Sequence, residues 1–321
     1  MTSSLPGPVA TAERIERPVD GAAPSSRRKF VVRAVCSAEE IDAAIGLLRA
    51  FAPRVTASDW RTVLVGPGRE ADGGREPKSV GFGAYHGGDM VGFLAAHASE
   101  RIIRGRLERI CNLHSVFVQP GFAPVGAYLL LAAMADPEVT LTALTPSPRV
   151  RDVLKAAHFD LLETASGLYP RLPDLHALRR GRPALQQVFG DETWLDPAHA
   201  RLLRDHAPHG CRGHVVLVGD VARAFVITQR GRLRRLPMLG VSEILYLSDP
   251  AVAVRHFGWL KLAIMRAEGT MLLRCDARLT GGARRLAFWR ARPGFFRSKR
   301  LQPIDIDNLY SEIIYLDVLA G

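Results

Sequence analysis

The order of structural signals between Leu107 and Tyr169 constrains the fold of this chain more than any other feature. The segment indicates a strand, a break, a helix, a second strand, a second helix and a returning strand. These signals lie at Ile110–Val118, Gln119–Gly121, Pro124–Met134, Val139–Thr145, Pro148–His158 and from Phe159 onward. Two neighbouring strands joined through a helix run parallel, because the helix returns the chain to the edge at which the first strand began. The segment therefore predicts the centre of a mixed α/β sheet.

An antiparallel run precedes this centre. The strand Lys29–Val35 leads into a helix whose start carries a capping box, Ser37 with Glu40, and a short helix follows at Ser58–Leu64. Gly66–Lys78 is a glycine-rich, charged loop. A hairpin and a second reversal complete the run, at Ser79–Tyr85, His86–Asp89, Met90–Ala98 and Arg104–Gly105.

The second half of the chain predicts a similar order of elements. Asp196 caps a helix that runs through Leu203, and a final strand is expected at Leu309–Leu316. Between them we expect a hairpin, a strand, a long helix, a strand and an arginine-rich helical stretch, at His214–Gln229, Ser242–Ser248, Ala251–Ala267, Thr270–Asp276 and Arg284–Arg300. The repeat of strand, helix and strand at a spacing of roughly 130 residues favours two similar domains in tandem.

Composition places the domain bounds. Residues 1–28 are rich in Ala, Pro, Ser and Gly without apolar periodicity, which predicts a disordered tail. The segment 173–190 is basic and interrupted by Pro and Gly, as linkers often are. We therefore predict an N-terminal domain at 29–172, a linker at 173–190 and a C-terminal domain at 191–321.

Charge and apolar content limit the classes of protein. The formal net charge of +11 attracts polyanions in general, including nucleic acids and the phosphates of nucleotides. No apolar run reaches the roughly 20 residues that span a bilayer, and no apolar segment follows Met1, so we expect a cytoplasmic protein without a membrane partner. The four cysteines are far apart, which predicts buried thiols rather than a disulfide framework.

The turn after the strand Ile110–Val118 could hold a phosphate group. Backbone N–H groups at a helix N-terminus attract anions, and glycine lets a ligand approach the backbone closely. Gly126 lies in the first turn of the predicted helix. The same residues also fit an ordinary strand-to-helix turn that packs an apolar face on a sheet, and both interpretations stay open.

This order of elements resembles the GNAT acyl-CoA acyltransferases, in which a turn of this kind receives the pyrophosphate of coenzyme A. The resemblance implies an α/β fold of mixed sheets with two tandem GNAT-like domains, the second degenerate, and an acetyl-CoA or other acyl-CoA co-substrate. The family has Arg or Gln where this chain has Ala123, and a small residue where it has Tyr128. The implied cofactor-binding residues are Val116, Phe117, Val118, Ala123, Val125, Gly126, Ala127 and Tyr128.

Direct acyl transfer to an amine or hydroxyl needs a base for the acceptor and an acid for the departing thiolate. The candidate bases on the strands are Glu100, Glu108 and His114, of which His114 is best placed, although a histidine in such a position is more often a hydrogen-bonded core residue. The family's acid is often a Tyr on the last helix. Leu154 occupies that position here, so Tyr169 on the following strand is the substitute. The candidate catalytic residues are therefore His114, Glu108 and Tyr169.

Two other groupings have alternative interpretations. His206, His209, Cys211 and His214 could ligate zinc, but their spacing matches no standard finger, and we assign no metal. Aromatic residues alternate with basic ones in Arg284–Arg300, which could bind nucleic acid but more often reflects core aromatics beside a solvated basic face.

The function predicted is transfer of an acyl group from a coenzyme A thioester to an amine or hydroxyl of an unknown small-molecule or protein acceptor. Two alternatives remain: a GNAT-like binding or regulatory protein without activity, and a basic protein associated with nucleic acid.

Overall fold

The computed structural model describes residues 29–66, 79–162, 165–173, 183–233, 236–280 and 287–315. The predicted tail at 1–28, nearly all of the loop at 66–78 and residues 174–182 of the predicted linker lie outside these ranges. Among the described residues, no helix combines the length and apolar character that crossing a bilayer requires.

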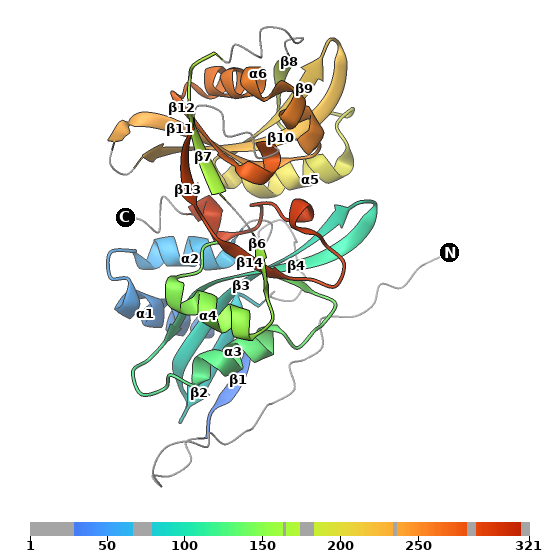
Figure 1. Cartoon of the computed structure of the whole chain (residues 1–321). Coiled ribbons are helices and arrows are strands. Elements are labelled where there is room, and N and C mark those ends of the chain that lie inside the picture. Colours follow the sequence, from blue (N-terminus) through green and yellow to red (C-terminus); the bar gives the residue numbers. More distant parts are fainter. Residues whose placement is uncertain are drawn as a thin grey trace. The chain divides into compact units, whose positions relative to one another are not determined.

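The strands form two mixed sheets of seven strands each, which confirms the predicted fold class (Figure 1). The first has the order β1-β2-β3-β4-β5-β14-β6 and the second the order β13-β7-β12-β11-β10-β9-β8. The strands of the first sheet are β1 (Val31–Val35), β2 (Gly81–His86), β3 (Asp89–Ile103), β4 (Arg106–Val118), β5 (Thr140–Ala143), β6 (Asp160–Leu162) and β14 (Gly294–Arg297). Those of the second are β7 (Ala165–Pro170), β8 (Pro183–Val188), β9 (Cys211–Val218), β10 (Val221–Leu233), β11 (Leu236–Leu247), β12 (Leu272–Asp276) and β13 (Phe288–Ala291).

The two sheets share one topological feature. Each has a parallel pair joined by a helix, β4 with β5 through α3 and β11 with β12 through α6. The α-helices are α1 (Ala38–Phe51), α2 (Ala57–Val65), α3 (Val125–Ala133), α4 (Pro148–Ala156), α5 (Pro197–His206) and α6 (Pro250–Glu268). The repeated order that the sequence indicated is therefore the crossover connection of each sheet.

Side-chain caps fix where four of these helices begin. Thr56 caps α2 by accepting a hydrogen bond from Asp59 N. Ser37 accepts a hydrogen bond from Glu40 N, and the Glu40 carboxylate accepts from Ser37 N, so the predicted capping box is present. Asp196 and Asp249 accept from the first amides of α5 and α6. A cap of this kind satisfies N–H groups that lack a partner within the helix.

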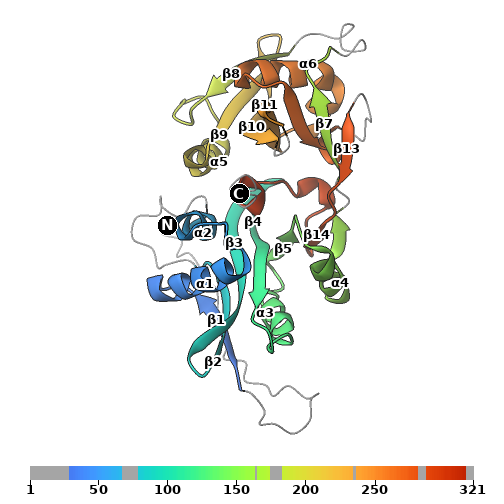
Figure 2. The ribbon, with the colours of Figure 1, turned by 90° about the vertical axis from the view of Figure 1, so that its left-hand side faces the viewer.

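Helix α3 packs closely on β3 because Gly92 has no side chain. A Cβ at Gly92 would lie 3.0 Å from Val125 Cγ1 and 3.3 Å from Leu129 Cδ1, both on α3. Helices α1 and α3 lie on opposite sides of strands β1 to β3 (Figure 2). The contacts group these elements in one compact unit, made of the described parts of 29–64, 79–97 and 113–137, and the remaining described residues form the other.

Helices cover both faces of the second sheet, as the contacts of two successive residues of β9 show. A Cβ at Gly213 would meet Leu203 of α5 at 2.6 Å, whereas the next side chain, His214, bonds to Glu268 of α6. Because successive residues of a strand point to opposite faces, α5 and α6 cover opposite faces of this sheet, as Figure 1 shows.

Each sheet takes one strand from outside its own run of sequence. Strand β7 follows β6 along the chain but pairs with β12 and β13 of the second sheet. Strand β14 follows β13 but inserts between β5 and β6 of the first. The predicted domain bounds at 29–172 and 191–321 therefore stay a prediction, since neither sheet is built from one continuous segment.

Three local predictions were wrong. Residues 183–188 of the predicted linker form β8, which pairs with β9. The arginine-rich stretch contains β13 and β14 rather than a helix, because Pro293 interrupts it and its aromatic residues favour strands. The expected final strand contains the 3-10 helix Glu312–Tyr315, whose side chains are all buried, so apolar periodicity could not distinguish strand from helix.

A substitution at Gly92 tests its packing role, and a substitution at Gly46 serves as the comparison. The two should change the free energy of unfolding in opposite directions. Gly92→Val should lower the free energy of unfolding by about 1–3 kcal/mol, because its methyl groups overlap Val125 and Leu129. Gly46→Ala should raise it by about 0.5–1 kcal/mol, because Gly46 is in the interior of α1 with nothing within 4 Å of a Cβ. Urea denaturation measures both, and a Gly92→Val protein as stable as the wild type would contradict the packing argument.

Candidate functional site

The turn that enters α3 is closed by its own backbone. Gln119 N donates to Val91 O on β3 at 2.9 Å, which anchors the start of the turn. Val125 N, Gly126 N and Ala127 N donate to the carbonyls three residues earlier at 2.8, 3.4 and 3.2 Å. The bond from Gly126 is long for an N–H···O bond, so this amide keeps capacity for another acceptor.

No side chain competes for these amides. The N-cap residue is Pro124, which makes no side-chain cap bond, and the first turn of α3 contains no acidic residue. Helices α1, α5 and α6 by contrast carry the caps Ser37, Asp196 and Asp249. The positive end of the α3 dipole is therefore not neutralised by its own sequence.

Gly126 is not required by the fold. Its backbone does not adopt the left-handed conformation, and a Cβ there would meet only Val118 Cγ2, at an ordinary 3.7 Å. Alanine would fit this position and would favour the helix. A glycine without a conformational or packing reason is consistent with close approach by a ligand.

The half-buried Tyr128 makes an aromatic contact. It meets Phe30, the residue before β1, edge to face with ring centroids 4.9 Å apart. Phe30 is 5% exposed, so the Tyr128 ring belongs to the packing of α3 on the first strand.

The end of β4 supplies the predicted strand residues of the site. Val116, Phe117 and Val118 are half-buried, and Phe117 packs on the ring of Phe51 at 5.2 Å. Val118 lies beside Gly126, whereas Ala123 and Ala127 are exposed at the start of α3. The structure thus brings Val118, Val125 and Gly126 together, and their role in binding coenzyme A stays a prediction.

His114 is buried in β4 beside a second histidine. Its Nδ1 lies 3.0 Å from Ser115 Oγ, and its Nε2 lies 3.3 Å from His97 Nε2 on β3. Burial, with a smaller contribution from the neighbouring His97, lowers the pKa of His114 well below its usual value. The imidazole is therefore neutral at pH 7, and its proton affinity is too low for a strong general base.

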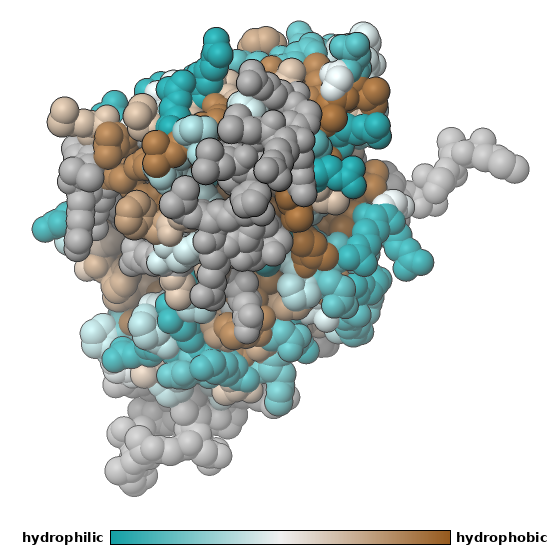
Figure 3. Space-filling model, turned by 45° about the horizontal axis from the view of Figure 1, so that its top comes forward, coloured by the Kyte–Doolittle hydropathy of each residue, from teal (hydrophilic) through white to brown (hydrophobic). Residues whose placement is uncertain are grey.

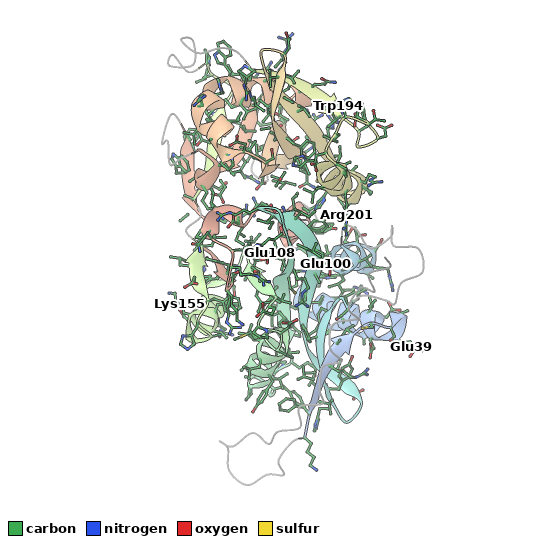
Figure 4. All side chains as sticks on the ribbon, turned by 90° about the vertical axis from the view of Figure 1, so that its right-hand side faces the viewer. Glu39, Glu100, Glu108, Lys155, Trp194 and Arg201 are labelled. Atoms are coloured by element: carbon green, nitrogen blue, oxygen red, sulfur yellow. The ribbon has the colours of Figure 1, made fainter. Side chains whose placement is uncertain are left out.

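Glu108 and Glu100 lie on the neighbouring strands β4 and β3 (Figure 4). Glu108 is 4% exposed and accepts from Arg300 Nε at 3.2 Å, which commits its carboxylate to an ion pair. Glu100 is exposed. The predicted role of Glu108 as a base thus competes with a structural one.

Tyr169 is in the core of the second sheet. It is 1% exposed, and its ring packs edge to face on Phe257 and Trp289 at 4.7 and 5.8 Å. Because Tyr169 lies on β7 and Glu108 on β4, the two predicted catalytic residues belong to different sheets. The contacts of Tyr169 are those of a core aromatic residue.

Helix α4 ends at a residue with an unusual backbone conformation. His158 follows α4 with φ of 59°, a left-handed conformation that favours glycine. Phe159 N closes the helix end by donating to Leu154 O at 3.0 Å.

Glu312 is a buried titratable residue that sequence reasoning did not identify as a candidate site residue. It is 3% exposed, accepts from Thr145 Oγ1 at 2.6 Å, and burial raises the pKa of its carboxyl. Within the described part of the chain, its Oε2 has no hydrogen-bond partner. No motif surrounds Glu312, and only its burial identifies it, so a single sequence offered no signal.

The three histidines of the possible zinc cluster have other partners, which for His209 Nδ1 is the Tyr315 hydroxyl at 3.2 Å. His206 Nδ1 donates to Leu202 O at 2.7 Å and its Nε2 accepts from Tyr310 N at 3.1 Å, and burial lowers its pKa to about 3. His214 bonds to the Glu268 carboxylate at 2.9 Å. No group of three or more possible metal ligands occurs among the residues that the structure describes.

Two arginines of the stretch Arg284–Arg300, and Arg274 before it, form ion pairs within the fold. Glu243 accepts from both Arg274 and Arg292, at 2.9 and 3.2 Å. Arg300 bonds to Glu138 as well as to Glu108. On the face shown in Figure 3, hydrophilic and apolar side chains are intermixed. These positive charges therefore have structural partners within the protein, and a bound polyanion is not required to explain them.

Solved structures show which known fold this is, although no family model and no curated protein matches the sequence. A GCN5-related N-acetyltransferase from Anabaena variabilis is 14% identical, with a TM-score of 0.54 over 83% of this chain and 72% of its own. A conserved protein of unknown function from Enterococcus faecalis, described as a probable N-acyltransferase, is 12% identical, with a TM-score of 0.51 over 85% and 74%. These similarities show the GNAT N-acetyltransferase fold and confirm the fold that the resemblance implied.

A third structure is more distant. The N-myristoyltransferase of Saccharomyces cerevisiae with bound myristoyl-CoA is 10% identical, with a TM-score of 0.42 over 92% of this chain and 88% of its own. It superposes too loosely to inform the function of this chain.

The buried Glu312 generates a prediction about pH. Because its folded-state pKa is raised above 4.5, its contribution to stability is present below that pH and is lost as pH rises through the folded-state pKa. Glu312→Gln removes this loss, so relative to the wild type the variant should gain about 1.4 kcal/mol for each unit of pKa difference. Chemical denaturation between pH 4 and 8 measures the gain.

The matched control is Glu39→Gln at an exposed position in the first turn of α1, labelled in Figure 4. It should not reproduce this pH-dependent gain. A Glu312→Gln protein whose stability runs parallel to that of the wild type across the range would contradict the raised pKa.

Proposed function

We propose that this protein transfers an acyl group from a coenzyme A thioester to an amine or hydroxyl acceptor, and that the thioester's pyrophosphate binds at the start of α3. The observation that carries the proposal is Gly126, a glycine that neither backbone conformation nor packing requires, at a helix start without a side-chain cap or an acid. In this chain α3 follows β4, which lies in the middle of the first sheet, and the fold is the one that N-acetyltransferases have.

The geometry of the turn suits a phosphate group. The amide of Gly126 holds its internal acceptor at a long distance, and the helix dipole adds partial positive charge at the same end. Val118 and Val125 beside Gly126 provide apolar surface. A pyrophosphate would thus meet donors without displacing a bound side chain.

A second candidate function is binding or regulation without acyl transfer. It is favoured by the missing family residues, since Ala123 stands in place of Arg or Gln and Leu154 in place of Tyr. It is also favoured by His114, which is neutral and buried. Ligand binding is therefore tested before turnover.

Calorimetric titration with acetyl-CoA and thermal unfolding with the same ligand test the site directly. A ligand at one hundred times its dissociation constant stabilises the folded state by about 2.7 kcal/mol. We expect a saturable binding signal and a rise in melting temperature. Their absence at millimolar acetyl-CoA would contradict the proposal, and binding without acyl transfer to any acceptor would support the second candidate.

Gly126→Glu separates binding from folding. A carboxylate in the first turn of α3 should leave the fold intact or stabilise it by about 0.3–1 kcal/mol, because it complements the helix dipole. The same charge should repel the pyrophosphate and abolish the response to acetyl-CoA. Calorimetry measures the binding and thermal unfolding measures the stability.

Leu131→Glu is the matched control for charge. Leu131 is 54% exposed on the same helix but lies beyond its first turn, so the variant should still bind acetyl-CoA. If Gly126→Glu binds as well as Leu131→Glu does, the pyrophosphate is not at the start of α3.

A further inference from the structure

A chain of hydrogen-bonding groups runs through the interior of the first unit to the surface of β4. His97 Nε2 lies 2.6 Å from the carbonyl oxygen of Val63 and 3.3 Å from His114 Nε2. His114 Nδ1 lies 3.0 Å from Ser115 Oγ. The two imidazole rings are 4% and 7% exposed, whereas Ser115 is half-buried.

The chemistry of these groups fixes which atoms carry protons. A carbonyl oxygen only accepts, so His97 Nε2 carries the hydrogen that bonds to Val63 O. His114 Nε2 then faces a donor nitrogen and must present a lone pair, because two N–H groups would repel each other. A neutral imidazole has one N–H, so the proton of His114 is on Nδ1 and donates to Ser115 Oγ.

This assignment leaves the hydroxyl of Ser115 with a hydrogen to donate. Among the described residues, His114 is the partner of Ser115 Oγ, and it occupies a lone pair of that oxygen. The hydroxyl hydrogen therefore points away from His114. Donation from Nδ1 also draws electron density from the oxygen, which makes its O–H a better donor.

The backbone at Ser115 is unusual for a strand. Its φ is 46°, a left-handed conformation that residues other than glycine rarely adopt within a strand. The pairing of β4 with β5 ends at Asn112 and Thr142, three residues before Ser115. Conformations of this kind bend a strand and re-aim a side chain, and they are concentrated at functional sites.

We propose that the Ser115 hydroxyl is the hydrogen-bond donor that polarises the carbonyl of the acyl thioester, and that His114 and His97 hold it in the donating orientation. This inference rests on the proposed function, because it assigns a role at the same coenzyme A site. Ser115 is the catalytic residue in this arrangement, and His114 and His97 are positioning residues. A donor aimed at the carbonyl oxygen stabilises the negative charge that develops there when the acceptor attacks.

The same proton assignment excludes a different role for Ser115. A nucleophilic serine needs a base with a free lone pair on the nitrogen that faces its hydroxyl. Here that nitrogen is Nδ1, which carries the proton. Ser115 is thus a donor to the substrate and forms no covalent bond with the acyl group.

The test uses the full-length protein and acetyl-CoA labelled with carbon-13 at the carbonyl. Ser115→Gly and Ser115→Ala both remove the hydroxyl, and isotope-edited infrared spectroscopy measures the carbonyl stretch of the bound ligand. We expect the stretch to rise in both variants relative to the wild type, because a hydrogen bond is lost. Calorimetry should show that both variants still bind acetyl-CoA, so that the stretch reports on a bound carbonyl.

Two further variants separate positioning from folding. His114→Leu removes the donor to Ser115 Oγ and should raise the stretch, whereas His114→Asn keeps an N–H near Nδ1 and should restore the wild-type value. The double variant of Ser115→Ala with His114→Leu should show no further rise, because the two residues act through one hydroxyl. Thr62→Val removes a hydroxyl bonded to Ser58 O on α2 and should leave the stretch unchanged.

The outcomes distinguish this inference from the proposed function. A wild-type protein that does not bind acetyl-CoA overturns both. Binding with a carbonyl stretch that is the same in the wild type and in both Ser115 variants overturns the role of Ser115 alone. Ser115→Gly should also melt at a higher temperature than Ser115→Ala, because only glycine adopts a φ of 46° without strain.

Discussion

The arrangement of the first unit depends on the close approach of α3 to β3, which the missing side chain at Gly92 allows. Val125 and Leu129 of the helix occupy the space that a Cβ at Gly92 would fill. The same approach brings the first turn of α3 beside Val118 at the end of β4, next to Gly126. A single packing constraint between helix and strand therefore sets the geometry of the candidate site.

Buried histidines illustrate how tertiary contacts choose the chemistry of a side chain. His206 is neutral because burial lowers its pKa to about 3, and its ring nitrogens bond to Leu202 O and Tyr310 N. His114 is neutral because it is buried beside His97. His214 instead bonds to the Glu268 carboxylate. The same residue type thus supports a helix end, a hydrogen-bonded chain and a buried acid–imidazole pair.

The exchange of β7 and β14 links the two sheets through the chain itself. The first sheet contains β14, which follows strands of the second sheet along the chain. The second sheet contains β7, which follows strands of the first. Completing the first sheet requires pairing of Phe295 with Ala143, which are far apart in sequence. Pairings over such separations form late and depend on the whole chain. The two sheets are therefore built together, although each repeats the same local order.

Local physics made much of the fold readable from the sequence. The box formed by Ser37 and Glu40, the cap at Asp196 and the apolar periodicity of the crossover helices each act within a few residues. They placed most helices and strands, and the resemblance of the Ile110–Met134 region indicated the fold. The turn at Gly126 was found for the same reason, because the requirement for glycine near a phosphate is local.

Only the tertiary structure decided the rest. The partners of β7 and β14, the burial of Glu312 and the left-handed backbone of Ser115 depend on residues distant in sequence or on strain imposed by the surrounding sheet. A sequence pattern reports which face of an element is apolar, but not which distant group will face it. The proton positions at His114 depend on such distant groups, because they are set by His97 and, through it, by the carbonyl of Val63.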